Sequence, residues 1–305
     1  MSGGTIAAAA LLDLTIGDPP SLPHPVVTIG HAARRAESFV RLHTENDLIG
    51  GGLVTLAIVA GAAIFGAIVE RAPFAVRVVA AASTLACGSL LDHAAPVRDA
   101  LECDDIGTAR LALARLVGRD TRELDEAGIA RAVVESLAES TCDGIVAPLL
   151  FLCVLGLPGA FAYKAINTLD SLIGHIEPPY TWFGRIAARL DDLANFVPAR
   201  MSAALIAAAA ATLGESGKAA VKVAIRDGGN HRSPNAGVSE AAMAGALGVR
   251  LGGSSSYDGI AHDAPLIGAE FAPPSRDSVR RAMCVTFVAS LFAFTLAACA
   301  ARACR

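Results

Sequence analysis

The sequence is short of charge. Only 18% of its 305 residues are Asp, Glu, Lys or Arg, whereas soluble domains carry about 25%. Hydrophobic residues make up 53% of the chain, and the mean hydropathy is +0.51. This composition disfavours an ordinary soluble domain and indicates an integral membrane protein.

Basic clusters, paired cysteines and a Walker A motif are also missing. The net charge is −4 and no dense block of Lys and Arg occurs, so no nucleic-acid partner is expected. The seven cysteines form no CxxC pair, which argues against a disulfide framework and a zinc site. Without a Walker A glycine–lysine pattern, the residues alone give no direct sign of nucleotide binding.

Long apolar segments predict an all-α polytopic membrane protein, organised as a single membrane-embedded domain over residues 1–305. About 20 apolar residues cross a bilayer. Clear spans are predicted near 51–69, 74–91 and 283–301. Two shorter candidates, 145–163 and 201–213, raise the total to about four or five, although each can also enter the membrane and return. Amphipathic and extramembrane helices between the spans carry the polar motifs.

The stretch from His231 to Gly253 combines a polar turn with a run of small helix formers. Gly237 breaks regular structure, and Ser239 is a good N-cap for a helix that starts at Glu240 and stops at Gly252. The N-terminus of such a helix presents free N–H groups to an anion. Four side-chain donors lie beside it: His231, Arg232, Ser233 and Asn235. An ordinary capped helix is the alternative interpretation.

An acidic run follows the first amphipathic region. Glu135, Glu139 and Asp143 are spaced i, i+4 and i+8, which places them on one face of a continuous helix. Mg²⁺ prefers oxygen ligands of this kind and often bridges to phosphate. A solvated acidic face is the alternative.

Further polar groups flank the apolar segments. One set shares a helical face and is suited to lining a site: Lys164, Asn167, Thr168 and Ser171. Arg185 and Arg189 are candidates for a phosphate clamp or for surface ion pairs. Prolines on both sides of His24 are expected to hold it and Asp18 in place, unless the segment is a surface turn.

Five motifs, taken in order, resemble those of the adenosylcobinamide-phosphate synthases, a membrane-bound family of cobalamin biosynthesis. They are Gly17-Asp18-Pro19 with Pro23-His24-Pro25, Glu135–Glu139 with Asp143-Gly144, Tyr163-Lys164 with Asn167–Ser171, Arg189–Asp192 with Pro198–Arg200, and Ser233–Gly237 with Glu240–Leu247. Mild departures from the family pattern occur at Ser140, Leu172, His175 and Ser239. They put substrate contacts in question more than the activity.

The resemblance implies an amide synthase, a carbon–nitrogen ligase. It would join aminopropanol, as its phosphate ester or in the free form, to the free carboxylate of adenosylcobyric acid, with ATP and Mg²⁺ activating that carboxylate. The implied catalytic residues are Glu135, Glu139, Asp143, Lys164, His231 and Asn235. The implied metal ligands are Glu139, Asp143, Asp191 and Asp192. The implied substrate- or phosphate-binding residues are Asp18, His24, Asn167, Thr168, Asp170, Ser171, Arg189, Arg200, Arg232, Ser233, Gly237 and Glu240.

The expected location is the cell (inner) membrane, with several spans. Basic residues gather in 92–144 and 214–281, so the positive-inside rule places these segments, and the site, on the cytoplasmic side. The bilayer and other enzymes of the cobalamin pathway are the expected partners, with the corrinoid as substrate. A membrane component of a corrinoid transporter and a non-catalytic scaffold are the rival functions.

Overall fold

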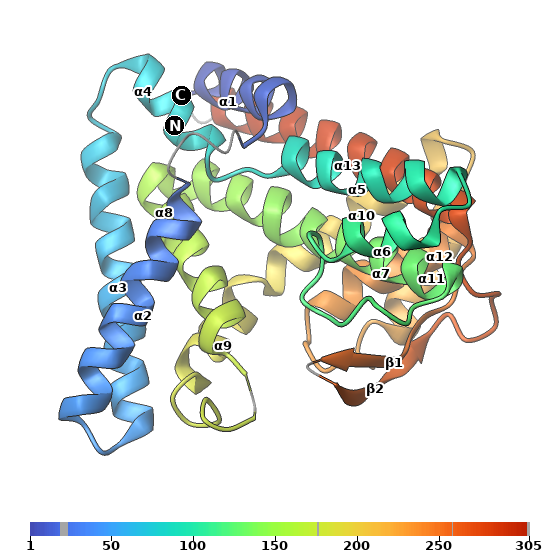
Figure 1. Ribbon diagram of the computed structural model, residues 1–305. Coiled ribbons are helices and arrows are strands. Elements are labelled where there is room, and N and C mark those ends of the chain that lie inside the picture. The colour runs from blue at the N-terminus through green and yellow to red at the C-terminus, as the bar shows by residue number, and fades with distance from the viewer. Residues whose placement is uncertain (19–23, 176, 258, 304–305) are drawn as a thin grey trace. The chain divides into compact units, whose positions relative to one another are not determined.

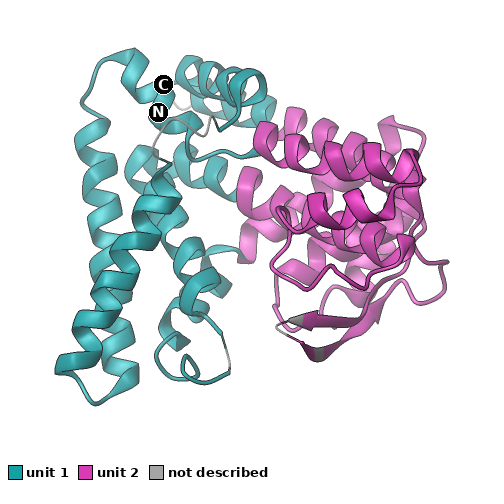
Figure 2. Ribbon diagram, viewed as in Figure 1, with its two compact units in different colours: residues 1–86, 147–195, 294–305 teal, residues 87–146, 196–293 magenta. Residues whose placement is uncertain are grey.

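The computed structural model describes residues 1–18, 24–175, 177–257 and 259–303, and most of them are helical (Figure 1). The chain divides into two compact units (Figure 2). Unit 1 comprises residues 1–86, 147–195 and 294–305, and unit 2 comprises residues 87–146 and 196–293. The predicted all-α membrane class is confirmed, whereas the single domain stays a prediction.

In unit 1, the long apolar helix α3 contacts most of the other helices. Its helices are α1 (Gly3–Ile16), α2 (Pro25–His43), α3 (Asp47–Val69), α4 (Phe74–Ala82), α8 (Ala147–Ile173) and α9 (Arg185–Ala194). Helix α3 contacts α8 and α2. A Cβ atom on Gly66 would lie 2.6 Å from the Leu157 carbonyl oxygen, so glycine is what allows α3 and α8 to approach so closely.

Unit 2 contains the remaining elements of the chain apart from the end of the last helix. They are α5 (Cys87–Glu102), α6 (Ile106–Leu113), α7 (Glu126–Ser140), a π-helical turn η1 (Thr141–Val146), α10 (Phe196–Thr212), α11 (Gly217–Asp227), α12 (Ala236–Leu247), β1 (Leu251–Tyr257) and β2 (Ile260–Ile267). Helix α13 (Arg276–Ala303) belongs to unit 2 as far as residue 293.

Helix α12 is the core of unit 2. Ten of its twelve residues, Gly237 and Ser239 to Leu247, are buried, and the helix contacts α7, α10 and α11. Most of its side chains are those of Ala, Gly and Ser, so neighbouring helices approach its backbone closely. A Cβ atom on Gly245 would lie 2.4 Å from the Ala219 carbonyl oxygen of α11. The small-residue run predicted as a helix is therefore the packing centre of the unit.

The predicted ends of this helix were wrong. Helix α12 begins at Ala236 rather than Glu240, because the Ser239 hydroxyl donates to the Ala236 carbonyl inside the helix (3.0 Å) instead of capping a helix start. The helix ends at Leu247, where Gly248 takes the left-handed conformation (φ 65°) that closes helices. Gly252, the predicted stop, lies in strand β1.

An antiparallel hairpin follows α12 and adds a small β element to the predicted all-α fold. Strand β1 pairs with β2, and the register shifts between Leu251 and Gly253. Gly252 and Gly253 have φ values of 77° and 87°, which residues other than glycine rarely adopt. The glycine–serine sequence of β1 lacks the alternating apolar pattern of a half-buried strand, which is why the sequence did not predict it.

Four helical segments of the described chain are long and apolar enough to cross a membrane: Asp47–Val69, Phe74–Glu102, Glu126–Ile173 and Arg276–Ala303. Helices α9 and α10, bent by 46°, bring the number up to five if they count as one broken span. The protein is therefore a multi-pass membrane protein.

Two of the predicted spans are broken. The segment 74–91 is interrupted between α4 and α5, which begins only at Cys87. The segment 145–163 is kinked inside α8, where Gly156 has φ 69° and Pro158 follows it.

Candidate functional site

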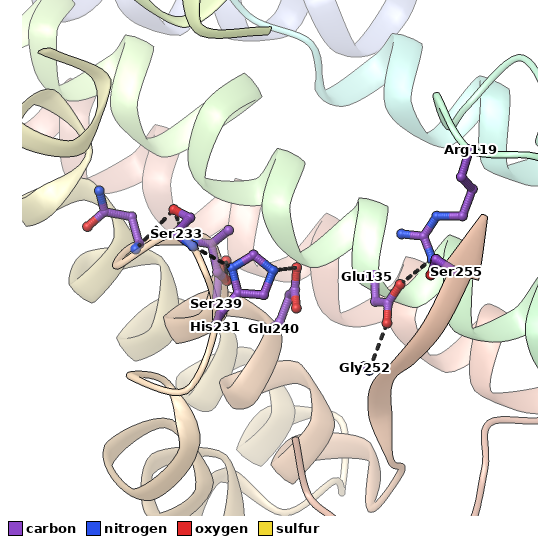
Figure 3. Close-up of polar contacts among 10 residues, drawn as sticks. Arg119, Glu135, His231, Ser233, Ser239, Glu240, Gly252 and Ser255 are labelled. Carbon is purple, nitrogen blue, oxygen red and sulfur yellow. Dashed lines mark hydrogen bonds and ion pairs between the residues drawn. The ribbon is translucent and has the colours of Figure 1, made fainter. Parts of the chain in front are cut away.

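Glu135 is held in place by hydrogen bonds within a polar cluster of unit 2 (Figure 3). It lies on α7 with only 7% of its surface exposed. One carboxylate oxygen accepts a hydrogen bond from the Arg119 guanidinium at 2.7 Å, and the other accepts one from the backbone N–H of Gly252 at 2.9 Å. Arg119 also donates to the Ser255 hydroxyl at 3.3 Å. The Glu135 carboxylate is therefore paired with a cation and hydrogen-bonded to strand β1.

Glu240 and His231 form the second half of the cluster. Glu240 lies on α12 with 6% of its surface exposed. Its carboxylate is 4.0 Å from His231 Nε2, and Figure 3 shows the two side chains pointing toward each other. His231 Nδ1 accepts a hydrogen bond from the Ser233 backbone N–H at 3.0 Å. Since Nδ1 is an acceptor, the neutral ring carries its proton on Nε2, facing Glu240.

The negative charges of Glu135 and Glu139 disfavour ionisation of the nearby Glu240 carboxyl. Burial raises the pKa of the Glu240 carboxyl well above its ordinary value, the charges of Glu135 and Glu139 raise it further, and the Arg119 guanidinium opposes them. Glu139 lies one turn after Glu135 on α7, and its side chain is exposed. The cluster therefore combines a carboxylate paired with a cation, a carboxyl that holds its proton to higher pH, and the exposed side chain of Glu139.

The loop before α12 is held by Arg200. Its guanidinium donates to the Asn235 side-chain oxygen at 2.6 Å and to the Pro234 carbonyl at 3.3 Å, and it stacks over the Phe196 ring at 4.0 Å. Asn235 is almost fully buried. These contacts fix the loop that carries His231.

The start of α12 is partly capped from within this loop. The Ser233 hydroxyl accepts hydrogen bonds from the N–H groups of Asn235 and Ala236, both at 3.3 Å. Two backbone N–H groups at the observed start of α12 are therefore engaged with Ser233, whereas the prediction placed the free N–H groups at a helix starting at Glu240. Gly237 allows the turn, since a Cβ atom there would lie 2.3 Å from His231 Cβ.

Asp143 does not continue the regular spacing of Glu135 and Glu139. Helix α7 ends at Ser140, and Asp143 lies in η1, whose wider turn breaks the i, i+4, i+8 register. A carboxyl that is distant in the sequence, Glu240, interacts with Glu135 and Glu139. Asp143 is half-buried.

Arg232 is exposed in the loop before α12 of unit 2, and the other predicted site residues belong to unit 1. In α8, Lys164 and Thr168 are buried, Asn167 and Asp170 are half-buried and Ser171 is exposed. The shared helical face predicted for this set falls within a continuous part of α8. Their position in unit 1 leaves their catalytic and substrate roles as predictions.

Two acids of α9 make different contacts. The Asp191 carboxylate accepts a hydrogen bond from Asn195 at 3.0 Å, and Asn195 accepts one from the buried Tyr163 hydroxyl at 2.9 Å. Asp192 pairs with the exposed Arg189 at 3.3 Å. The Arg189–Asp192 contact is a surface ion pair, which was the alternative interpretation of Arg189 in the sequence.

Asp18 and His24 lie close together, with Asp18 Oδ1 3.4 Å from His24 Nε2. His24 Nδ1 accepts a hydrogen bond from the Val26 N–H at 3.2 Å and so caps α2. Of the prolines expected to hold them, Pro25 is the first residue of α2, and Pro19, Pro20 and Pro23 lie outside the described residues.

No group of three or more His, Cys, Asp or Glu side chains within the described ranges is close enough to hold a metal ion. Mg²⁺ usually keeps several waters and binds one or two carboxylates together with substrate phosphates. Mg²⁺ binding by the chain's acids therefore stays a prediction.

Arg119, Arg131 and the hairpin were missed by sequence reasoning. Arg119 lies in the irregular segment between α6 and α7, 16 residues before its partner Glu135. Arg131 Nη2 donates to the Ser254 carbonyl at 2.6 Å, and its other terminal nitrogen donates to the Gly252 carbonyl. No local pattern signals these contacts, because each depends on where the hairpin folds back.

The comparisons with known proteins agree on one family. A family model described as CobD/Cbib protein matches residues 6–286. A cobalamin biosynthesis protein CobD of Geobacter metallireducens is 46% identical over 89% of this chain and 88% of its own. A CobD of Brucella suis is 44% identical over 87% and 86%, and a CbiB of Salmonella typhimurium is 42% identical over 94% of both chains. No solved structure matches.

Proposed function

Because the chain belongs to the CobD/CbiB family and has a role in cobalamin biosynthesis, we propose that it is an adenosylcobinamide-phosphate synthase. It would join aminopropanol O-phosphate, or aminopropanol itself, to the free carboxylate of adenosylcobyric acid by an amide bond. A carboxylate does not condense with an amine unaided at neutral pH, so ATP would first convert it to an acyl phosphate. The observation that supports this assignment best is the Glu135–Glu139–Glu240 cluster with its cationic partner Arg119 and with His231.

The bond changes place demands on nearby side chains. The neutral amine nitrogen attacks the acyl carbon, the C–N bond forms, the bond to the phosphate oxygen breaks, and inorganic phosphate leaves. The nitrogen must shed a proton in this step. Glu240 suits that role because its raised pKa brings it nearer to the working pH, where general bases are most effective.

His231 would be a donor rather than the base. Its Nδ1 is occupied by the Ser233 N–H, so its Nε2–H can donate to Glu240 or to an anionic oxygen of the substrate. Mg²⁺, when bound with the nucleotide, would neutralise charge on the transferring phosphate. Glu139 and Asp143 are the carboxylates that would hold it, and Asp191 with Asp192 is the second candidate pair.

The cationic and polar side chains would bind the substrates. Lys164, Arg189, Arg200 and Arg232 would offset phosphate charge. We expect Asn235 to act by fixing the loop through Arg200. The site would face the cytoplasm from the cell membrane, where ATP is available, as the distribution of basic residues predicts.

The test is an amide-formation assay on detergent-purified protein with adenosylcobyric acid, aminopropanol phosphate, Mg²⁺ and ATP, omitting each in turn. Product mass would be read directly, and we expect product only when ATP is present. Glu139→Ala should abolish turnover while leaving membrane expression intact, with Glu123→Ala as a control acid on the same unit. Protein that binds corrinoid but forms no product under any combination would instead support the transporter or scaffold function.

A further inference from the structure

A pocket of about 400 Å³ lies between α10 and α11 of unit 2, within the usual size of ligand pockets, about 300–1,000 Å³. No residue of the Glu135–Glu139–Glu240 cluster lines it. Arg200 does line it, and its guanidinium donates to the chain's own Asn235 at 2.6 Å. Most of the remaining lining is aliphatic: Ala203, Ala204, Val221, Ala224, Ile225 and Val238. The pocket therefore offers mainly a surface for a hydrocarbon chain.

Helix α11 borders this pocket with an exposed face that mixes apolar and basic side chains. Ile225 is 81% exposed and Val221 is 47% exposed, and Lys218 and Lys222 are exposed beside them. These four residues are spaced i, i+3, i+4 and i+7, so they share one side of the helix. Exposed apolar side chains that continue into a pocket mark an interaction surface rather than ordinary solvent contact.

The charge of the two lysines is not balanced within the described residues. Neither lysine makes a hydrogen bond or ion pair with any of them. The acids nearest to α11 are already paired: Glu215 accepts from Arg281 at 2.7 Å, and Asp227 and Glu270 both pair with Arg226. Two like charges one turn apart repel each other. This face is therefore suited to an anion that comes from outside the chain.

The membrane is the source of a partner that has both properties. The protein has several helices long and apolar enough to cross a bilayer, and α10, the other wall of the pocket, passes that test together with α9. An apolar wall formed by such a helix is suited to an acyl chain. Lysine stems can lie along apolar surface while the ammonium groups reach the headgroup level, and amphipathic helices with basic polar faces lie in the membrane interface.

We propose that α11 and its pocket bind an anionic phospholipid of the bilayer. Lys218 and Lys222 contact the headgroup phosphate, and an acyl chain lies against Val221 and Ile225. The inference goes beyond the proposed reaction, in which no lipid takes part. It also gives α11 the task of holding unit 2, which carries the acid cluster, at the membrane surface.

The test is fluorescence quenching of the full chain in phosphatidylcholine vesicles that contain brominated phosphatidylglycerol or brominated phosphatidylcholine. Ile225→Trp together with Trp182→Phe leaves one tryptophan in the chain, on the exposed face of α11. We expect both lipids to quench it and the anionic lipid to bind about tenfold or more tightly, because each lysine near the surface attracts anionic lipid. Lys218→Gln with Lys222→Gln should remove this preference, whereas Lys218→Arg with Lys222→Arg should keep it.

The matched control is Arg115→Gln with Arg122→Gln, which removes two exposed arginines of the same unit outside the pocket and should keep the preference. Three results would overturn the proposal: no quenching by either lipid, equal binding of both lipids, or the same loss of preference in the lysine and arginine pairs. Absence of quenching would assign this face to a protein partner or to water. Matching size-exclusion profiles would show that the variants are folded.

Discussion

Arg119 and Glu135 form an ion pair of 2.7 Å in which the side chains are only 15% and 9% exposed. Arg119 comes from an irregular segment and Glu135 from the middle of α7. The pair therefore fixes a loop of unit 2 against a helix, and the same carboxylate holds strand β1 through Gly252.

Replacing Arg119 by Ala should destabilise the protein by about 3 kcal/mol, because removing one partner leaves a buried charge without compensation. Thermal unfolding in detergent would measure the loss. The control is Arg189→Ala, whose side chain is 74% exposed in its pair with Asp192. That change should alter stability by less than about 1 kcal/mol. Equal effects of the two changes would show that burial does not set the strength of these pairs.

Replacing Glu240 by Gln should reduce the pH dependence of stability. The folded-state pKa of Glu240 is raised, so its contribution is fully present below the unfolded pKa and is lost as the pH rises through the folded value. The neutral amide avoids that loss, and we expect Glu240→Gln to unfold at a higher temperature than the wild type at pH 8 and similarly at pH 4. A wild-type melting temperature independent of pH would contradict the raised pKa.

The same substitution separates two chemical roles. If Glu240 accepts the proton of the attacking amine, Glu240→Gln loses turnover while becoming more stable. The reaction assay at pH 7 and 8 would measure this. Turnover near the wild-type level would show that Glu240 contributes only packing and hydrogen bonding. Another group would then have to act as the base.

Replacing Gly237 by Ala should displace the loop that carries His231. The added Cβ would lie 2.3 Å from His231 Cβ and 2.7 Å from the Gly228 carbonyl oxygen, and such overpacking costs about 1–3 kcal/mol. Gly229→Ala is the matched control, because a Cβ there meets nothing within 4 Å. We expect lower turnover and a lower melting temperature only for Gly237→Ala. A variant pair with the same melting temperature would mean that the loop moves aside freely.

Replacing Arg200 by Lys should lower activity with little change in stability. The guanidinium contacts both Asn235 and Pro234, whereas a lysine ammonium cannot reproduce this forked geometry. The exposed position of Arg200 limits the effect on folding. Activity and melting temperature measured together would check this, and normal kinetics in Arg200→Lys would show that charge alone holds the loop.

The helices and spans could be predicted because their signals are local. The length and composition of the apolar run in α3 are enough to predict a membrane span. The small residues of α12 favour a helix whatever it packs against. Its ends were harder to predict, since Ser233 and Ser239 are both suitable caps in sequence. Only the folded loop brings the Ser233 hydroxyl to the N–H groups of Asn235 and Ala236.

The candidate site could be predicted only in part, because its residues come from distant parts of the sequence. Glu135 and Glu139 follow from helical spacing, but their partner Glu240 lies more than 100 residues later in the sequence. The π-helical turn at Thr141–Val146 interrupts the register that would have added Asp143. Tertiary contacts of this kind have no local sequence signal, and the hairpin that brings Gly252 to Glu135 has none either.

The two hydrogen bonds of Gly252 have a further consequence. Its N–H group is held by Glu135 and its carbonyl by Arg131, residues one turn apart on α7. Gly252 therefore joins two successive peptide groups, one hydrogen-bonded to an acid and the other to a base. Because both contacts hold the backbone of the same residue, the loss of either one would also loosen the anchor of the other.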